Sequence, residues 1–287
     1  MYRLTPNRIT RFQRMIYDHF REHGRVLPWR STQDPYRILV SEIMLQQTQV
    51  ERVLLKYEAF LEQLPDIESL ATATLRQVLA AWQGLGYNRR AVALQRTAQR
   101  IVNDFEGRIP ASYDTLLIFP GIGPATAGAI LAFAFEEPSV FIETNIRRVF
   151  IHFFFRGRTD VHDREILPLV AETLDRRRPR NWYYALMDYG AMLKTAEQNP
   201  NRRSKHYAAQ ARFKGSDRQI RGLILKALLR TPSLGLDEVA SAVAEPLERT
   251  RRLIYSLVQE GFLTRTGETL RIAVSEVMGE SVDEENR

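Results

Sequence analysis

Apolar residues recur every three or four positions along most of the chain, which is the spacing of one face of an α-helix. Pro, Gly and Asn separate the runs, as expected where helices end. Residues 140–142 are β-branched and aromatic but too few to indicate a strand. The pattern therefore predicts an all-α fold. The predicted helices cover residues 9–23, 40–64 (one or two helices), 67–84, 89–105, 113–118, 125–135, 146–155, 163–174 and 182–193.

The pattern changes after residue 193. Residues 194–216 are polar and basic with little apolar periodicity, which is typical of a linker or of a loop that contacts phosphates. Three short helices are predicted next, and a two-stranded hairpin then brackets Gly267. Three helices and a hairpin resemble a winged helix-turn-helix module, with the third helix in the recognition position. Such modules bind either DNA or protein, and both remain open. The three helices cover residues 220–229, 236–243 and 247–259.

Charge adds a candidate partner. The 287 residues include 41 Lys+Arg and 34 Asp+Glu, a formal charge of +7, and all but five of the bases are Arg. The last fourteen residues hold five acids and one base, so the remaining 273 residues carry +11. Because a guanidinium binds phosphate through a planar fork, this Arg-rich body favours a nucleic-acid partner. A genome whose codons favour Arg is the alternative.

The chain contains no cysteine. This excludes disulfides, thiolate nucleophiles, and zinc or iron–sulfur sites with Cys ligands. The first thirty residues lack the apolar core of a signal peptide, and no run of eighteen apolar residues occurs. We therefore expect a cytoplasmic protein with no membrane partner.

A tight hairpin and a carboxylate mark the middle of the chain. Residues 119–127 (FPGIGPATA) place two glycines and a proline directly before a helix, whose first backbone N–H groups can bind a phosphate. Glu143 follows in residues 142–149 (IETNIRRV), just before a basic amphipathic helix. An acid at that place is also favoured simply as an N-cap.

Four further motifs flank this centre. They are residues 27–30 (LPWR), 41–50 (SEIMLQQTQV), 82–91 (WQGLGYNRRA) and 185–192 (ALMDYGAM). Glu42 stands on an otherwise apolar helix face within the second of them. Together with the hairpin, the motifs resemble the helix-hairpin-helix (HhH-GPD) DNA glycosylase superfamily, most closely its A/G-specific adenine glycosylase branch. The resemblance spans about residues 8–193.

This resemblance implies a two-lobed helical glycosylase domain over residues 1–216, followed by the winged-helix-like module at 217–273 and an acidic tail at 274–287. Lobe A would cover about 31–140, and lobe B about 1–30 with 141–216. The implied partner is double-stranded DNA with a lesion or mismatch, from which one nucleotide is flipped into the protein. We expect a monomer associated with the nucleoid of a bacterium or archaeon.

The resemblance also assigns roles. Glu42 matches the general acid that protonates the purine, Glu143 matches the carboxylate that stabilises the sugar cation, and Asn145 orients it. The base pocket falls to Leu27, Trp29 and Arg30, and the DNA wedge to Gln46, Gln47 and Tyr87. The DNA-backbone residues are Gly121, Gly123, Ala125, Thr126, Arg147, Arg202, Arg203 and Lys205. No metal is expected on side chains, although the carbonyls of Leu117, Phe119 and Ile122 match an alkali-ion site.

Two departures concern the chemistry. The family's catalytic carboxylate is Asp, and the extra methylene of Glu143 moves the charge by about 1.5 Å. Ala125 occupies the position at which bifunctional members carry a nucleophilic Lys, and residues 121–150 contain no Lys. The sequence therefore predicts base hydrolysis without strand cleavage.

Two departures concern accessory parts. A [4Fe-4S] cofactor is excluded because no position of its cysteines holds a thiolate, and we expect no cofactor at all. A winged-helix-like module stands where the family usually carries a domain that recognises 8-oxoguanine. A basic loop with Arg202, Arg203 and Lys205 would keep the DNA-backbone role of the cluster loop. Lys194, Asn201, Ser204 and Gln210 align with the cluster cysteines.

The predicted function is thus a monofunctional base excision repair DNA glycosylase that removes adenine opposite G or 8-oxoguanine. A glycosylase for hypoxanthine, or for uracil or thymine in mismatches, is one alternative. A catalytically weak lesion-binding protein is the other.

Overall fold

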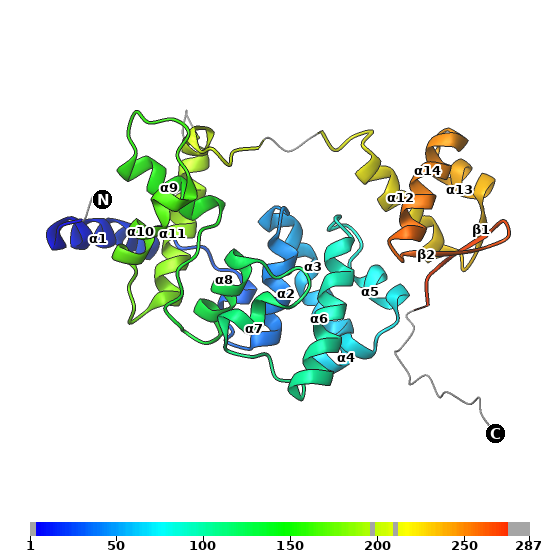
Figure 1. Ribbon diagram of the computed structural model, residues 1–287, viewed down its shortest axis with the longest axis horizontal. Coiled ribbons are helices and arrows are strands. Elements are labelled where there is room, and N and C mark those ends of the chain that lie inside the picture. The colour runs from blue at the N-terminus through cyan, green and yellow to red at the C-terminus, as the bar shows by residue number, and fades with distance from the viewer. Residues whose placement is uncertain (1–3, 196–198, 209–211, 275–287) are drawn as a thin grey trace, which may run out of the picture. The chain divides into compact units, whose positions relative to one another are not determined.

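The computed structural model describes residues 4–195, 199–208 and 212–274. These residues are mostly helical, which confirms the predicted all-α class (Figure 1). They form two compact units. Unit 1 combines residues 1–57 with 100–210, and unit 2 combines 58–99 with 211–287. Within the described ranges, none of the helices is both long and apolar enough to cross a membrane.

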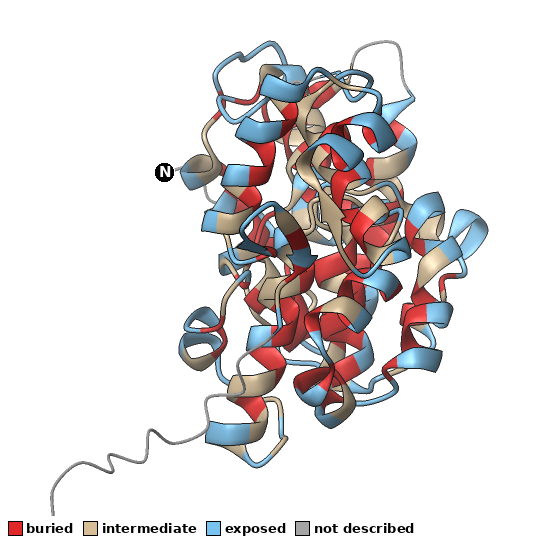
Figure 2. Ribbon diagram, turned by 90° about the vertical axis from the view of Figure 1, so that its right-hand side faces the viewer, coloured by how far each residue is buried: buried red, intermediate tan, exposed pale blue. Residues whose placement is uncertain are grey.

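The helices of unit 1 bury one apolar side each, and Figure 2 shows buried and exposed positions alternating along them. The largest contacts join α11 to α9 and to α1, and α2 to α8. Their core contains the fully buried aromatic rings of Trp182, Tyr183 and Phe150. The elements of unit 1 are α1 (Pro6–His23), η1 (Pro28–Arg30), α2 (Pro35–Leu45), the first part of α3 (Val50–Gln63), α7 (Tyr113–Leu117), α8 (Pro124–Ala134), α9 (Thr144–Phe154), α10 (Asp163–Thr173), α11 (Pro179–Lys194) and η2 (Pro200–Arg203).

Local sequence explains the helix starts that position the site. Asp34 accepts hydrogen bonds from the backbone N–H groups of Tyr36 and Arg37, and Pro35 occupies the first turn of α2. Pro124 starts α8 in the same way after the glycine hairpin. The predicted segment 40–64 forms two helices, because the chain turns at Gln47 with a positive φ of 55°.

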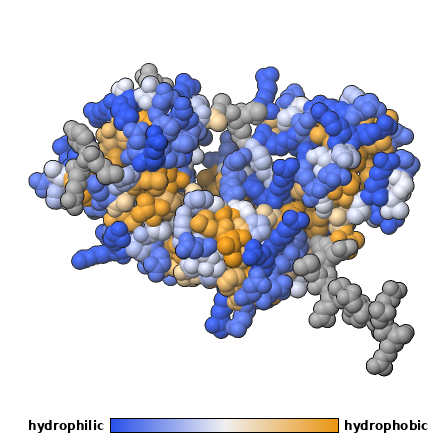
Figure 3. Space-filling model, viewed as in Figure 1, coloured by the Kyte–Doolittle hydropathy of each residue, from blue (hydrophilic) through white to orange (hydrophobic). Residues whose placement is uncertain are grey.

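Unit 2 contains α4 (Ile67–Thr72), α5 (Leu75–Ala81), most of α6 (Arg89–Phe105) and the C-terminal module. The module has three helices and a three-stranded antiparallel sheet in the order β1-β3-β2. This is the predicted winged-helix arrangement with one added strand, β1, which is too short to have a sequence pattern. In the view of Figure 3, hydrophilic side chains prevail over its helices. Its elements are α12 (Asp217–Arg230), β1 (Leu234–Gly235), α13 (Leu236–Val243), α14 (Leu247–Gln259), β2 (Leu263–Thr266) and β3 (Thr269–Ile272).

The predicted domain limits, 1–216 and 217–273, remain a prediction. The acidic residues of the tail lie at 276 and beyond, outside the described residues.

Candidate active site

Glu42 is the one acid on the buried side of α2. Its helix neighbours Ser41 and Ile43 are buried, as are the apolar residues one turn earlier. Burial raises the pKa of the Glu42 carboxyl to about 8, and the nearby charge of Glu143 adds to the shift, while Arg30 opposes it. A carboxyl in this setting keeps its proton at neutral pH.

Glu143 has the same side chain in a different setting. It is the N-cap of α9: its Oε1 accepts hydrogen bonds from the backbone N–H groups of Asn145 and Ile146, both at 2.8 Å. Its Oε2 accepts a third from the Asn145 amide at 3.2 Å. Burial raises the Glu143 pKa, but these N–H donors and two arginines oppose the shift. Both carboxyls thus have raised pKa values, but Glu143 alone accepts hydrogen bonds from a helix N-terminus, and these stabilise its charged form.

A buried arginine, Arg148, holds the side chain of Asn145 at the oxygen of its amide, while the nitrogen of that amide donates to Glu143. The Arg148 guanidinium donates to Asn145 Oδ1 at 2.7 Å and to the carbonyl of Gly190 on α11. Its Nε donates to Asn199 Oδ1 at 3.0 Å. Gly190 is required here, because a Cβ at that position would collide with the backbone carbonyl of Asn145. The orientation of the Glu143 carboxylate thus depends on α11 and on the loop that follows it.

Arg30 is held by Asp188, a buried acid that sequence reasoning did not assign to the site. Both guanidinium Nη atoms donate to the carboxylate at 2.8 Å, and Arg25 Nε donates to it at 2.7 Å. Arg30 and Arg25 lower the Asp188 pKa against its burial. The guanidinium of Arg30 also lies 4.5 Å from the ring centre of Tyr184. A signal was available, because Asp188 interrupts the apolar side of a predicted helix.

Two residues predicted to line the base pocket are core residues of unit 1. Leu27 and Trp29 are both almost fully buried, and the Trp29 ring packs edge-on against Tyr57 at 5.4 Å. With Arg30 they form the short segment that Asp188 holds in place. Their contact with a base stays a prediction.

The structure joins one predicted wedge residue to the hairpin. Gln46 Nε2 donates to the carbonyl of Gly121 at 3.0 Å and to the hydroxyl of Thr126 at 3.1 Å. Gly121 has a φ of 79°, which favours glycine, and Gly123 is the N-cap of α8. Gln47 is exposed on the turn after α2, whereas Tyr87 belongs to unit 2.

Ala125 lies in the first turn of α8 and is partly buried. Of the three carbonyls predicted to hold an alkali ion, that of Phe119 accepts a hydrogen bond from the Ile122 N–H at 3.2 Å. Leu117 ends α7 and is partly exposed. The ion site and the DNA contacts of this hairpin stay predictions.

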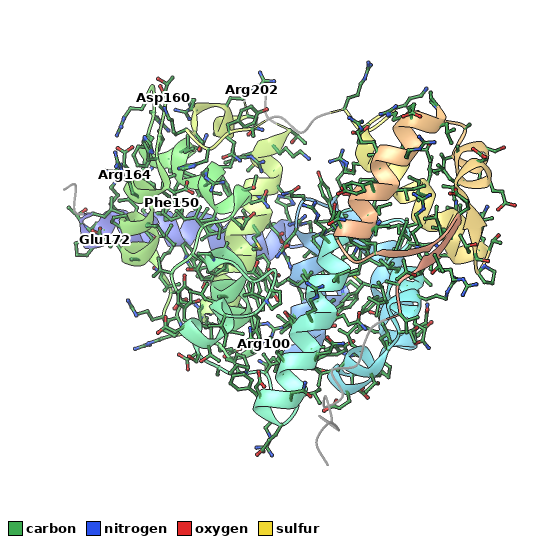
Figure 4. The ribbon with its side chains drawn as sticks, turned by 45° about the vertical axis from the view of Figure 1, so that its right-hand side comes forward. Arg100, Phe150, Asp160, Arg164, Glu172 and Arg202 are labelled. Carbon is green, nitrogen blue, oxygen red and sulfur yellow. The ribbon has the colours of Figure 1, made fainter. Side chains whose placement is uncertain are left out.

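The basic side chains predicted to contact the DNA backbone differ in how many contacts they make within the protein. Arg147 forms a two-pronged ion pair with Asp163, with both N–O distances at 2.6 Å. Arg203 donates to the carbonyl of Phe155 at 2.6 Å, which ties it to the end of α9. Arg202 and Lys205 are exposed, and Figure 4 shows Arg202 at the edge of unit 1. The last two are therefore better placed to meet a phosphate.

The positions aligned with cluster cysteines do not fit a cluster. Asn201 is buried and donates to the carbonyl of Thr144 at 2.9 Å. Ser204 is buried and forms a parallel bridge with Val161. Lys194 ends α11, and Gln210 lies outside the described residues. Hydrogen bonds to α9 hold this loop, and among the described residues no group of three His, Asp or Glu side chains is arranged to bind a metal ion.

Comparisons with known proteins identify the family to which this chain is similar. Residues 40–168 match the model of the HhH-GPD superfamily base excision DNA repair proteins. The adenine DNA glycosylase of Mycolicibacterium smegmatis is 35% identical over 272 residues, covering 88% of this chain and 91% of the relative. The adenine DNA glycosylase of Buchnera aphidicola is 36% identical over 187 residues, 63% of this chain and about half (52%) of the relative.

Solved structures share the fold. A thermostable thymine-DNA glycosylase matches 67% of this chain and 90% of its own, with a TM-score of 0.61 and 26% identity. Endonuclease III in a non-covalent complex with DNA matches 68% of this chain and 90% of its own, with a TM-score of 0.58 and 18% identity.

Proposed function

The chain belongs to the HhH-GPD superfamily of base excision DNA repair proteins, and from this premise we propose that it is a monofunctional glycosylase that removes mispaired adenine from duplex DNA. The base opposite would be guanine or 8-oxoguanine. The proposal rests on the pair Glu42 and Glu143: burial keeps a proton on the first, and three hydrogen-bond donors are arranged to stabilise a charge on the second. The relatives named as adenine DNA glycosylases support the choice of base.

Glu42 supplies the proton. In this proposal its carboxylic acid protonates N7 of the flipped adenine, so that the base leaves with the electron pair of the C1′–N9 bond as a neutral molecule. Burial keeps this acid protonated up to a pH of about 8, close to the working pH of a cell.

Glu143 meets the positive charge that remains on the sugar. A carboxylate near C1′ stabilises an oxocarbenium ion electrostatically, and its hydrogen bonds to Asn145 and Ile146 fix it before the reaction begins. Water then adds to C1′ and releases a proton to the solvent, from which the Glu42 carboxylate regains the proton it gave to the base.

The absence of Lys from the hairpin and from the helix that follows it supports a reaction that stops at the abasic site. Position 125 is Ala, and residues 121–150 contain no Lys to form a Schiff base. We further propose that a single chain acts on chromosomal DNA in the cytoplasm.

Thymine in T:G mismatches is a second candidate, favoured by the likeness to the thymine-DNA glycosylase. A pyrimidine has no N7, so the Glu42 acid would have to act on a different atom, such as the carbonyl oxygen O2. We therefore rank mispaired adenine first.

A single-turnover panel tests the proposal. Duplexes with A:8-oxoG, A:G, hypoxanthine:T, U:G and T:G are incubated with excess protein and then cleaved with alkali. We expect product from A:8-oxoG or A:G, and only after alkali. Product from T:G alone would establish the second candidate, and cleavage without alkali would contradict the monofunctional mechanism. Tight binding to one duplex with no product from any would identify a lesion-binding protein.

A further inference from the structure

The loop between α5 and α6 carries Tyr87 in an unusual backbone conformation. Gly84 and Gly86 have positive φ angles of 94° and 70°, and Tyr87, which has a side chain, has a φ of 49°. A non-glycine residue keeps such a conformation only where its surroundings fix it, and such sites cluster where proteins bind or react. The neighbours of Tyr87 must therefore maintain this conformation of the loop.

From inside unit 2, two side chains fix the loop through one carbonyl. The Trp82 indole N–H and the Arg90 guanidinium both donate to the carbonyl of Gly86, each at 3.1 Å. Arg90 lies 5.4 Å from the Trp82 ring centre and 5.5 Å from that of Tyr87. Trp82 and Arg90 thus hold the backbone directly before Tyr87.

From the other side, the C-terminal module holds the ring itself. The guanidinium of Arg218, in the first turn of α12, donates to the Tyr87 hydroxyl and lies 4.7 Å from the centre of its ring. The exposed ring of Phe213 lies 5.3 Å from the same guanidinium. A residue of the module therefore fixes the orientation of Tyr87.

The helix that carries Arg218 is itself anchored to the same unit. Arg76 on α5 donates to the carbonyls of Leu228 and Leu229 at 2.9 and 3.0 Å, near the end of α12. Glu260 accepts hydrogen bonds from Arg89 on α6 and from Arg221 on α12, both at 2.7 Å. These contacts, the first above all, lower the Glu260 pKa to about 2. These contacts hold α12, and with it Arg218, against α5 and α6.

We propose that Arg218 is a positioning residue that holds Tyr87 ready to enter the DNA stack, so that the C-terminal module serves recognition of the damaged pair. This rests on the proposed glycosylase function, in which Tyr87 is a wedge. A ring already fixed by Arg218 loses less freedom when it inserts beside an unpaired base, which strengthens binding. Matched DNA offers no gap, so the gain is specific to the mispair.

The test compares Arg218→Ala, Arg218→Lys, Tyr87→Phe and the double variant Arg218→Ala/Tyr87→Phe with Arg230→Ala. Arg230 is an exposed base at the end of the same helix and serves as the charge control. All are placed in a Glu42→Gln background, so that the substrate stays intact. Dissociation constants are measured for A:8-oxoG and matched duplexes. 2-Aminopurine next to the lesion reports stacking, and thermal melting reports folding.

We expect Arg218→Ala to weaken binding of the mispair about threefold to tenfold, with matched DNA changed less than twofold. Tyr87→Phe removes the hydrogen bond but keeps the ring beside the guanidinium, so its effect should be smaller and in the same direction, and the double variant should lose no more than Arg218→Ala. The 2-aminopurine signal should fall in all three at an unchanged melting temperature, and Arg218→Lys should recover part of the loss.

Three outcomes overturn the proposal. Equal losses on mispaired and matched DNA, as in Arg230→Ala, would make Arg218 a plain phosphate contact. Additive effects would show that the two side chains act separately. Tighter binding by Arg218→Ala would make the contact a latch that restrains Tyr87. Binding and stacking are read without base release, so a protein that prefers the mispaired duplex but releases no adenine fails the activity panel and can still pass this test.

Discussion

The middle of α2 and the start of α9 each carry one buried glutamate, and the two regions surround it differently. Glu42 lies among buried apolar residues, and its pKa rises to about 8. Glu143 is surrounded by donors: two backbone N–H groups, the Asn145 amide and, behind them, Arg148. The comparison shows that the same side chain can lie where burial favours its protonated form or where hydrogen-bond donors stabilise its charged form.

Glu42→Gln is the variant for which we expect the largest loss of activity. The amide cannot give a proton, so single-turnover base release should fall by about 10³-fold to 10⁴-fold. The same variant should melt about 2–4 °C higher at pH 8. A raised pKa means that the folded wild type binds a proton which the unfolded chain has lost, so its stability falls as pH rises from 4.5 to about 8.

Glu42→Asp is the control that keeps the acid on a shorter arm. Release by Glu42→Gln within tenfold of the wild type would remove Glu42 as the proton donor.

The second prediction separates the charge of Glu143 from its length. Glu143→Gln should lower the rate about 10²-fold to 10³-fold, because it removes the charge that faces the sugar cation. Glu143→Asp should stay within about tenfold of the wild type. An aspartate N-cap reaches the same N–H groups of Asn145 and Ile146. Equal losses in both variants, measured by single-turnover kinetics, would mean that length rather than charge is decisive.

A smaller effect is expected from removing the contact that holds Arg148 behind Asn145 and Glu143. Asn199→Ala removes the acceptor of Arg148 Nε, and we expect a rate about threefold to tenfold lower, with duplex affinity unchanged. Asn199→Asp keeps an acceptor oxygen and should recover most of the rate. A change in affinity alone would assign Asn199 to DNA binding.

The smallest effects should distinguish the bases of the loop that follows α11. Replacing Arg202 and Lys205 with Ala should weaken duplex binding and reduce the salt slope by about 2, one for each lost phosphate contact. Arg203→Ala should leave the slope unchanged and lower stability by about 1–2 kcal/mol, because its guanidinium caps the end of α9. Binding titrations between 50 and 200 mM salt (about the range in which such contacts respond) and thermal melting check both. An unchanged slope in the double variant would contradict the DNA role of the loop.

Periodicity and the motifs predicted most of the fold from sequence. Residues 89–105 form α6 as predicted, because a long amphipathic run leaves little choice of structure. The two-residue strand β1 was missed, since its conformation depends on pairing with β3 and not on local pattern. For Glu143, the N-cap reading and the catalytic reading rest on the same carboxylate, so the sequence could not choose between them.

Contacts between residues that lie far apart in the chain could not be predicted from the sequence. Asp188 gathers Arg25 and Arg30 from the other end of unit 1, and only the fold brings them together. The same holds for Arg218 on the ring of Tyr87. The sequence placed Glu42 on an apolar helix face, but the second cause of its raised pKa is Glu143, far along the chain.

The pH dependence of single-turnover adenine release tests the central claim most directly. If Glu42 is the acid and holds its proton to a pH of about 8, the rate should fall about tenfold per unit above that pH, and it should also fall at low pH, where Glu143 takes up a proton and loses its charge. A fall with rising pH that begins near pH 4.5, or a rate that stays level to pH 10, would contradict the account.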